Sequence, residues 1–276
     1  MDAFPGRDLG RVALAVLVPL GALALVAPYV PLPRPPAQGE VSALAAALAF
    51  GITAGALLLA AYLVPAAWLG RARNGALVVG AGLALAALSR VVPPAASGLL
   101  GSLAVVLVAS VPGAAVGERI AHPGHLLAVA LTSTAVDLWS VYAPRGVTHA
   151  VVQQPVLLEL LTLRAAIPPE RAPSPMIGFG DVVFAVLYLS VSRRFGLGLR
   201  RTTAALGAGL LAAGVAAMTL GLPGGVPALP FLGFAVVLAH REARSVPPGD
   251  RRTTLLAAAL VVAAVARVAW LFRHGW

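Results

Sequence analysis

Long apolar stretches separated by short polar ones dominate the pattern of this chain. Most of these stretches have the length of about 17 to 25 residues that a helix needs to cross a bilayer. Prolines, glycines or arginines separate them. The pattern predicts nine transmembrane helices, at residues 12–32, 42–66, 75–95, 97–117, 124–143, 177–193, 202–222, 227–240 and 254–272.

The one sizeable connection between predicted helices is residues 144–175, which is rich in proline. Within it, residues 151–167 mix leucines with Gln153, Glu159 and Arg164. Such a mixture is typical of a short amphipathic helix that lies on the membrane surface. We therefore expect a surface helix in this connection.

Composition agrees with a membrane protein. The 276 residues are 59% hydrophobic and only 11% charged, with a mean hydropathy of +0.91. These values lie outside the range of soluble globular proteins. The expected fold is all-α and polytopic, with N-terminal membrane helices in residues 1–123, a catalytic membrane core in 124–241 and a C-terminal helix in 242–276. The chain has no cysteine, which excludes disulfides and thiolate chemistry.

All 20 basic residues are arginines, and the net charge is +10. No basic stretch is interleaved with aromatic residues, so nucleic acid is not an expected partner. Arginines in short loops follow the positive-inside rule and can bind anionic lipid headgroups. The loops at 193–201 and 241–252 are the richest in arginine and should be cytoplasmic. The N-terminus is then also cytoplasmic, and the 144–175 loop lies outside.

Two acidic residues stand inside membrane-length apolar segments, Asp137 and Asp181. A charged side chain in hydrocarbon costs several kcal/mol, so such residues usually serve a function. Asp137 lies near the outer end of its helix, and Asp181 lies near the outer start of the next one. At a rise of about 1.5 Å per residue, each is about 7 to 10 Å inside the same membrane face. The two carboxylates can therefore meet.

Two carboxylates that share a desolvated site cannot both ionise, so the pair offers a base and an acid together. This is the arrangement with which aspartic proteases activate water. Gly178 and Gly180 precede Asp181. Their small size predicts a close approach of a neighbouring helix.

A third block begins the eighth predicted helix on the same face, at residues 224–230, Gly-Gly-Val-Pro-Ala-Leu-Pro. Pro227 and Pro230 fit a first helical turn, where a missing N–H costs little. Unpaired backbone groups there could bind an extended substrate if they line a water-filled cavity.

These residues resemble the presenilin and signal peptide peptidase family of intramembrane aspartyl proteases. The resemblance implies a prokaryotic-type homologue that lies in a cell membrane. Val136-Asp137-Leu138, with the following Pro144-Arg145-Gly146, is similar to the Tyr-Asp helix of that family and its Pro-Lys-Gly exit. Gly178-Phe179-Gly180-Asp181 is similar to its Gly-x-Gly-Asp signature, and Pro227-Ala228-Leu229-Pro230 to its Pro-Ala-Leu motif. The similarity covers about residues 130–230.

The resemblance implies a presenilin-like bundle that needs no cofactor or metal. Asp137 and Asp181 would be the catalytic pair. Substrates would be single-pass membrane proteins or signal-peptide-like segments. The residues of the other two motifs would shape the active site and help to bind substrate: Gly178, Phe179, Gly180, Pro227, Ala228, Leu229 and Pro230.

The chain departs from the family pattern in two respects. Val136 replaces the tyrosine before the first aspartate, so its hydroxyl is either missing or supplied elsewhere, with Tyr142 as a candidate. Five helices, rather than the six of the family, are predicted up to Asp137. The predicted outside position of the 144–175 loop matches the signal peptide peptidase orientation.

Two other functions are compatible with the two acids. A prepilin-peptidase-like enzyme shares a Gly-x-Gly-Asp block, but its aspartates lie toward the cytoplasm. A proton-coupled transporter could use the acids as a relay. His122 and His125 suggest a metal site, but no third ligand is near them in the sequence, and we interpret them as part of a polar loop.

Overall fold

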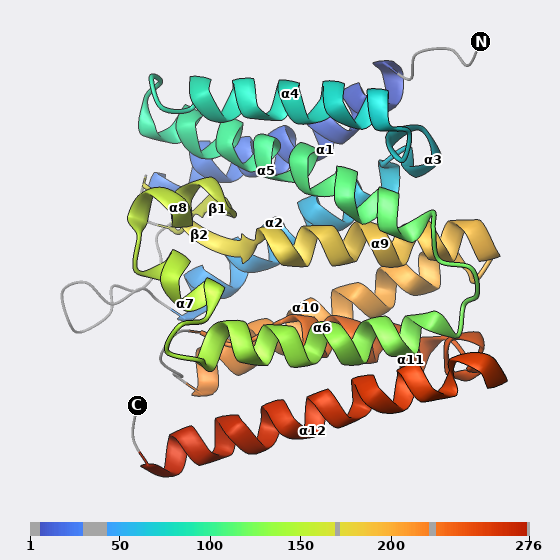
Figure 1. Cartoon of the computed structure of the whole chain (residues 1–276). Coiled ribbons are helices and arrows are strands. Elements are labelled where there is room, and N and C mark those ends of the chain that lie inside the picture. The colour runs from blue at the N-terminus through green and yellow to red at the C-terminus, as the bar shows by residue number, and fades with distance from the viewer. Residues whose placement is uncertain (1–5, 30–42, 169–171, 221–224, 275–276) are drawn as a thin grey trace. The chain divides into compact units, whose positions relative to one another are not determined.

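The computed structural model describes residues 6–29, 43–168, 172–220 and 225–274, and this part of the chain is mainly helical (Figure 1). The α-helices are α1 Gly6–Val26, α2 Ala43–Leu63, α3 Ala66–Leu69, α4 Ala72–Leu88, α5 Pro94–Gly117, α6 His125–Tyr142, α7 Val147–Val152, α8 Pro155–Leu160, α9 Phe179–Phe195, α10 Leu199–Leu220, α11 Leu229–Ala239 and α12 Arg251–His274. Two strands, β1 Thr162–Ala166 and β2 Pro173–Gly178, and three short 3₁₀ turns, Ala27–Tyr29, Glu242–Arg244 and Pro248–Asp250, complete the described structure.

Five of the described helical segments are long and apolar enough to cross a membrane. They are Arg7–Tyr29, Ala43–Leu63, Pro94–Gly117, Leu199–Leu220 and Pro248–Leu271. The predicted helical membrane protein is confirmed at this level. Each of the nine predicted segments contains an α-helix, although residues 30–32, 42 and 221–222 of those segments lie outside the described residues.

The chain divides into two compact units. The first unit contains residues Met1–Glu118 and Glu159–Ser190, and the second contains Arg119–Leu158 and Val191–Trp276. Helix α9 begins in the first unit and ends in the second. Each unit has its own helix packing and is described by itself.

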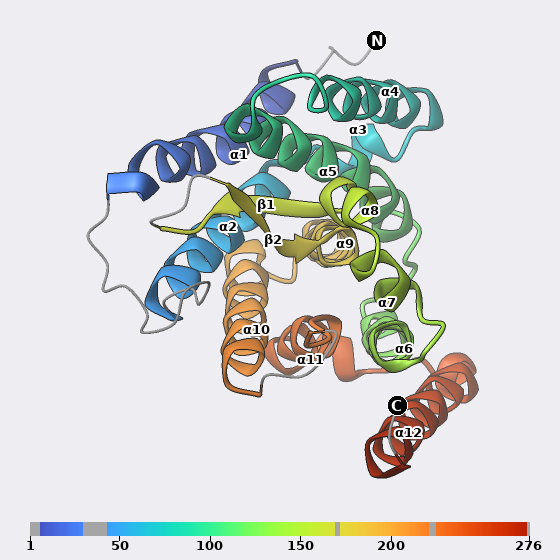
Figure 2. The same cartoon turned by 90° about the vertical axis from the view of Figure 1, so that its left-hand side faces the viewer.

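In the first unit, α5 is the helix that contacts the most partners. It packs against α1, α3, α4 and both strands, and Figure 2 shows the strands beside it. Gly113 and Gly117 of α5 lie against α9, where a Cβ at Gly117 would stand 2.7 Å from the Cβ of Ser190. Small residues four apart permit this close approach of two helices.

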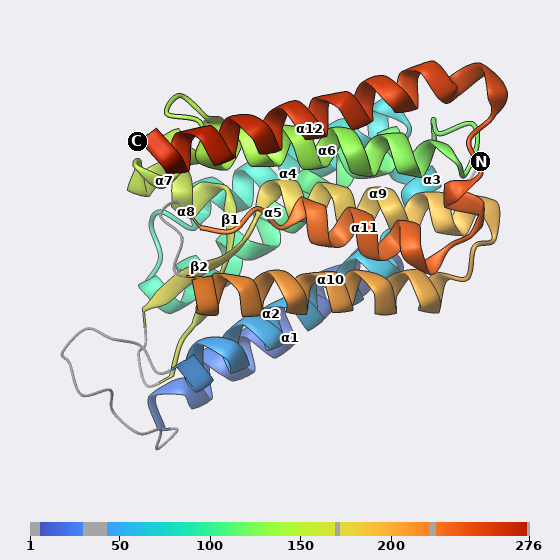
Figure 3. The same cartoon turned by 90° about the horizontal axis from the view of Figure 1, so that it is seen from below.

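In the second unit, α6 packs against α11 and α12, and α10 packs against α11. Figure 3 shows α12 running along α6. Gly209 of α10 lies against the backbone of α11, where a Cβ would stand 2.8 Å from the carbonyl oxygen of Phe231. The contact between α6 and α11 is the one that positions the candidate site.

The surface helix predicted at 151–167 is wrong beyond Leu160. The chain forms two short helices, α7 and α8, and then β1, which pairs antiparallel with β2. Pro155 lacks the N–H that would continue α7, so it separates the two helices. In β1, Leu163 and Ala165 are buried, which favours a strand packed against α5 over a helix at the membrane surface.

Candidate active site

Asp137 lies in the last third of α6, five residues before its end at Tyr142. Its side chain is partly buried. The carboxylate oxygen Oδ2 accepts a hydrogen bond of 3.0 Å from the backbone N–H of Leu229, which is 92 positions away in the chain. The first aspartate therefore contacts the Pro-Ala-Leu block, as the predicted common face requires.

The bond to Asp137 is explained by where α11 begins. Ala228 is the N-cap, Leu229 is the first helical residue, and Pro230 lies in the first turn. The first N–H groups of a helix have no partner within it, so the carboxylate of Asp137 satisfies one of them. The prediction for Pro230 is confirmed, whereas Pro227 precedes the N-cap. Unpaired backbone groups of this block were expected to be open to an extended substrate. The N–H of Leu229 is not open in this way, because it already binds Asp137.

Tyr142 provides a second contact between α6 and the start of α11. Its side chain is 4% exposed, and its hydroxyl donates a hydrogen bond of 3.3 Å to the carbonyl oxygen of Gly225. Two residues of α6 thus bind both ends of the short stretch 225–229. Val136, at the position of the family's tyrosine, is 60% exposed and makes no comparable contribution.

Asp181 is the third residue of α9. Its Oδ2 accepts a hydrogen bond of 3.0 Å from the backbone N–H of Gly178. An acidic side chain that reaches back three residues to the N-cap backbone is half of a capping box, and the helix dipole favours negative charge there. Asp181 lies nearer the helix start than predicted, because β2 continues to Gly178.

The predicted role of Gly178 and Gly180 in close helix packing is not supported. Gly178 ends β2, and a Cβ there would stand 3.4 Å from Oδ2 of Asp181. Gly180 is exposed, and a Cβ there would have no described heavy atom within 4 Å. Phe179 joins strand to helix through its N–H, which donates to the carbonyl oxygen of Leu161 at 2.8 Å.

The structure thus assembles the predicted site as two groups. In the second unit, Asp137 meets the block 227–230. In the first unit, Asp181 follows Gly178, Phe179 and Gly180 at the junction of β2 and α9. The two aspartates lie in different units, so their approach to one another stays a prediction.

The histidine loop is held by an acidic partner that the sequence did not indicate. Nε2 of His125, at the start of α6, lies 2.9 Å from Oδ2 of Asp250, which precedes α12. Nδ1 of His122 accepts the Gly124 N–H at 3.0 Å. Among the described residues, no group of three or more His, Cys, Asp or Glu side chains is arranged to hold a metal. We interpret these contacts as joining α6 to α12.

Sequence reasoning missed Arg164, which it placed on a surface helix. The residue lies in β1 and is 6% exposed. A signal for its position is present in α5, where Ser97, Gly98, Gly101 and Ser102 form a polar and small-residue face within an apolar helix. Comparisons with protein-family models, curated proteins and solved structures find no match for the chain. The family resemblance therefore rests on the three sequence blocks.

Proposed function

We propose that the protein is an intramembrane aspartyl endopeptidase that hydrolyses peptide bonds within transmembrane segments. The proposal includes a presenilin-like bundle of nine membrane helices, with the 144–175 loop outside the cell. One observation carries it above all, the hydrogen bond from Leu229 to Asp137. That bond joins two of the three family-like blocks. Short motifs that matched the family by chance would have no reason to lie in contact.

In the proposed reaction, Asp137 and Asp181 share one proton and hold a water molecule. The ionised carboxylate takes a proton from the water molecule, and the oxygen of that water bonds to the peptide carbonyl carbon. The protonated carboxyl gives its proton to the carbonyl oxygen. The tetrahedral intermediate then collapses: the carboxylate that is now ionised takes a proton from one of its hydroxyl groups, the C–N bond breaks, and the other, protonated carboxyl gives its proton to the leaving amine, so the pair again shares one proton.

The block 227–230 is proposed to form one wall of the site. A carboxylate has two oxygens, each with two lone pairs, so the Leu229 N–H can orient Asp137 and leave acceptor capacity for water. Pro227 and Leu229 are buried, whereas Ala228 and Pro230 are partly exposed. The partly exposed pair is where we expect a substrate segment to bind.

The test is a cleavage assay with purified protein in liposomes and a single-pass test substrate. Wild type should cut the substrate within its membrane segment, and Asp137→Asn and Asp181→Asn should each reduce the rate by about a thousandfold or more. Asp250→Asn, which changes an aspartate outside the proposed site, should retain most of the activity. The proposal fails if wild type cuts nothing or if either site variant retains cleavage.

The same preparations separate the alternative functions. A proton-coupled transporter would acidify the liposomes without cutting any substrate. A prepilin-peptidase-like enzyme would cut at the cytoplasmic end of a substrate's apolar segment rather than within it. The position of the cut, determined by mass spectrometry, distinguishes that enzyme from the one proposed.

A further inference from the structure

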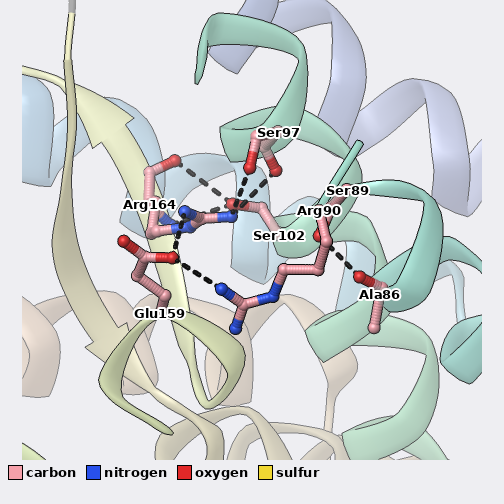
Figure 4. A network of polar contacts seen from close by, with 7 residues as sticks. All are labelled: Ala86, Ser89, Arg90, Ser97, Ser102, Glu159 and Arg164. Atoms are coloured by element: carbon pink, nitrogen blue, oxygen red, sulfur yellow. Dashed lines mark hydrogen bonds and ion pairs between the residues drawn. The ribbon is translucent and has the colours of Figure 1, made fainter. Parts of the chain in front are cut away.

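Arg164 is a buried arginine whose backbone and side chain both bind α5, and all of these contacts lie in the first unit (Figure 4). Its N–H donates to the hydroxyl of Ser102 at 2.9 Å, and that hydroxyl donates back to the Arg164 carbonyl oxygen at 3.2 Å. One guanidinium nitrogen, Nη2, donates to the carbonyl oxygen of Ser97 at 2.8 Å. These bonds attach β1 to α5.

The face of α5 is shaped to receive the hairpin of β1 and β2. A Cβ at Gly101 would stand 2.5 Å from Nη2 of Arg164, and a Cβ at Gly98 would stand 2.8 Å from the ring of Pro173. Each strand therefore lies against one glycine. We call Ser97, Gly98, Gly101 and Ser102 the hairpin seat.

The charge of Arg164 is balanced by Glu159, which is 47% exposed. A carboxylate oxygen of Glu159 lies 3.6 Å from Nη1 of Arg164 and 3.1 Å from Nη1 of Arg90. Burial lowers the pKa of Arg164, and Glu159 opposes that shift. A buried ion pair is weak evidence for stability, because desolvation offsets its attraction, and one well-attested use of such a group is to fix a register.

The register of the hairpin connects Arg164 to Asp181. Arg164 pairs with Pro175, Leu163 with Ile177, and Thr162 with Gly178. Gly178 is the residue whose N–H binds the Asp181 carboxylate. The path from Arg164 to that carboxylate thus runs through three strand pairs and one hydrogen bond.

We propose that Arg164 is a positioning residue: by fastening the hairpin to the hairpin seat, it fixes Gly178 and hence the Asp181 carboxylate. The effect of Arg164 on catalysis rests on the proposed protease function. The attachment of the hairpin to α5 does not rest on it. The planar fork of a guanidinium suits it to hold several acceptors in one geometry, which a lysine does less well.

The structural part is tested without any activity measurement, because the chain has no cysteine. Ser174→Cys places a single thiol on β2, opposite Ala165. We expect Arg164→Met to raise the rate of maleimide labelling at this thiol by about tenfold, the effect of losing charge-assisted bonds. Arg164→Lys should give a smaller rise. Arg90→Met is the matched control, because it leaves the hairpin seat intact, and it should label at the wild-type rate.

Ser102→Ala guards against a variant that fails to fold, because it removes one hydroxyl and little volume. It should fold normally and raise labelling by a few-fold. The proposal is wrong if Arg164→Met and Ser102→Ala both label at the wild-type rate, or if Arg90→Met labels as fast as Arg164→Met.

The catalytic part is tested in the cleavage assay. We expect Arg164→Met to lower kcat by about tenfold to a hundredfold with KM little changed, since a misplaced catalytic group costs rate and the block 227–230 is unaltered. Partial recovery in Arg164→Lys would support the role. Unchanged kcat with faster labelling would overturn the link to Asp181. If wild type cuts nothing, the protease proposal fails, and the labelling result still decides whether Arg164 fastens the hairpin to the hairpin seat.

Discussion

At the scale of single residues, Tyr142 is the contact that distinguishes this chain from the family pattern. The family's tyrosine precedes the first aspartate, whereas Tyr142 follows Asp137 by five positions and donates to Gly225. Its hydroxyl can stabilise the stretch 225–229 that carries Ala228 and Leu229. Val136 is exposed and Tyr142 is buried, so the Tyr142 hydroxyl reaches this stretch from a buried position of α6 that Val136 does not occupy.

Tyr142→Phe tests that interpretation with the smallest possible change. The ring stays, and only the hydrogen bond to Gly225 is lost, which is worth about 1 kcal/mol or about fivefold in rate. We expect cleavage to fall by about that factor and the unfolding temperature in detergent to fall by only a few degrees. An unchanged cleavage rate would show that the hydroxyl has no part in the site. Val136→Tyr should then be tried as a direct replacement.

The candidate residues differ in how far sequence could place them. The partnership of Asp137 with the block around Leu229 follows from motif order and helix count, and the structure bears out that contact. The bond from Tyr142 to Gly225 depends on how α6 rotates about its axis, which short motifs do not encode. Arg164 was misplaced because its partners are 62 and 67 positions away.

At the scale of elements, the hairpin is the main feature that sequence did not predict. Residues 162–166, Thr-Leu-Arg-Ala-Ala, lack the alternation of a half-buried strand, and both Pro173 and Pro175 argue against a strand at β2. The pairing is determined by burial against α5 and by the hairpin seat. The long helices were predictable because apolar length alone specifies them.

The close packing of α5 against α9 predicts a steric effect. A Cβ at Gly113 would meet the carbonyl oxygen of Val183 and lie 3.0 Å from the Cβ of Val186. Gly113→Ala should destabilise the protein by about 2 kcal/mol, because backbone must move to admit the methyl group. Gly80→Ala in α4, where a Cβ would meet no atom of the described residues within 4 Å, is the control and should be neutral or stabilising. Thermal unfolding in detergent measures both.

The end of α11 is joined to α10 by a buried hydrogen bond. His240 is buried, and its Nε2 lies 2.9 Å from Oγ1 of Thr202, which donates its hydrogen to Ser192. The ring therefore donates through Nε2, and Nδ1 is a buried atom without a partner among the described residues.

At the scale of the whole molecule, the distribution of arginines predicts the orientation in the membrane. Ala150 lies exposed in the loop predicted to be outside, and Gly249 lies exposed in a loop predicted to be cytoplasmic. In intact cells, a membrane-impermeant thiol reagent should label Ala150→Cys and should label Gly249→Cys only after lysis. The reverse pattern would invert the orientation and favour the prepilin-peptidase-like alternative.

The central claim is that the two aspartates, one in each unit, form a single site. Cross-linking tests it most directly, because the chain has no cysteine of its own. Asp137→Cys combined with Asp181→Cys should be joined within one chain by a short bifunctional thiol reagent. Asp137→Cys combined with Ser190→Cys, nine residues and about 13 Å further along α9, should not be joined. Efficient linking of the second pair and not the first would contradict the account.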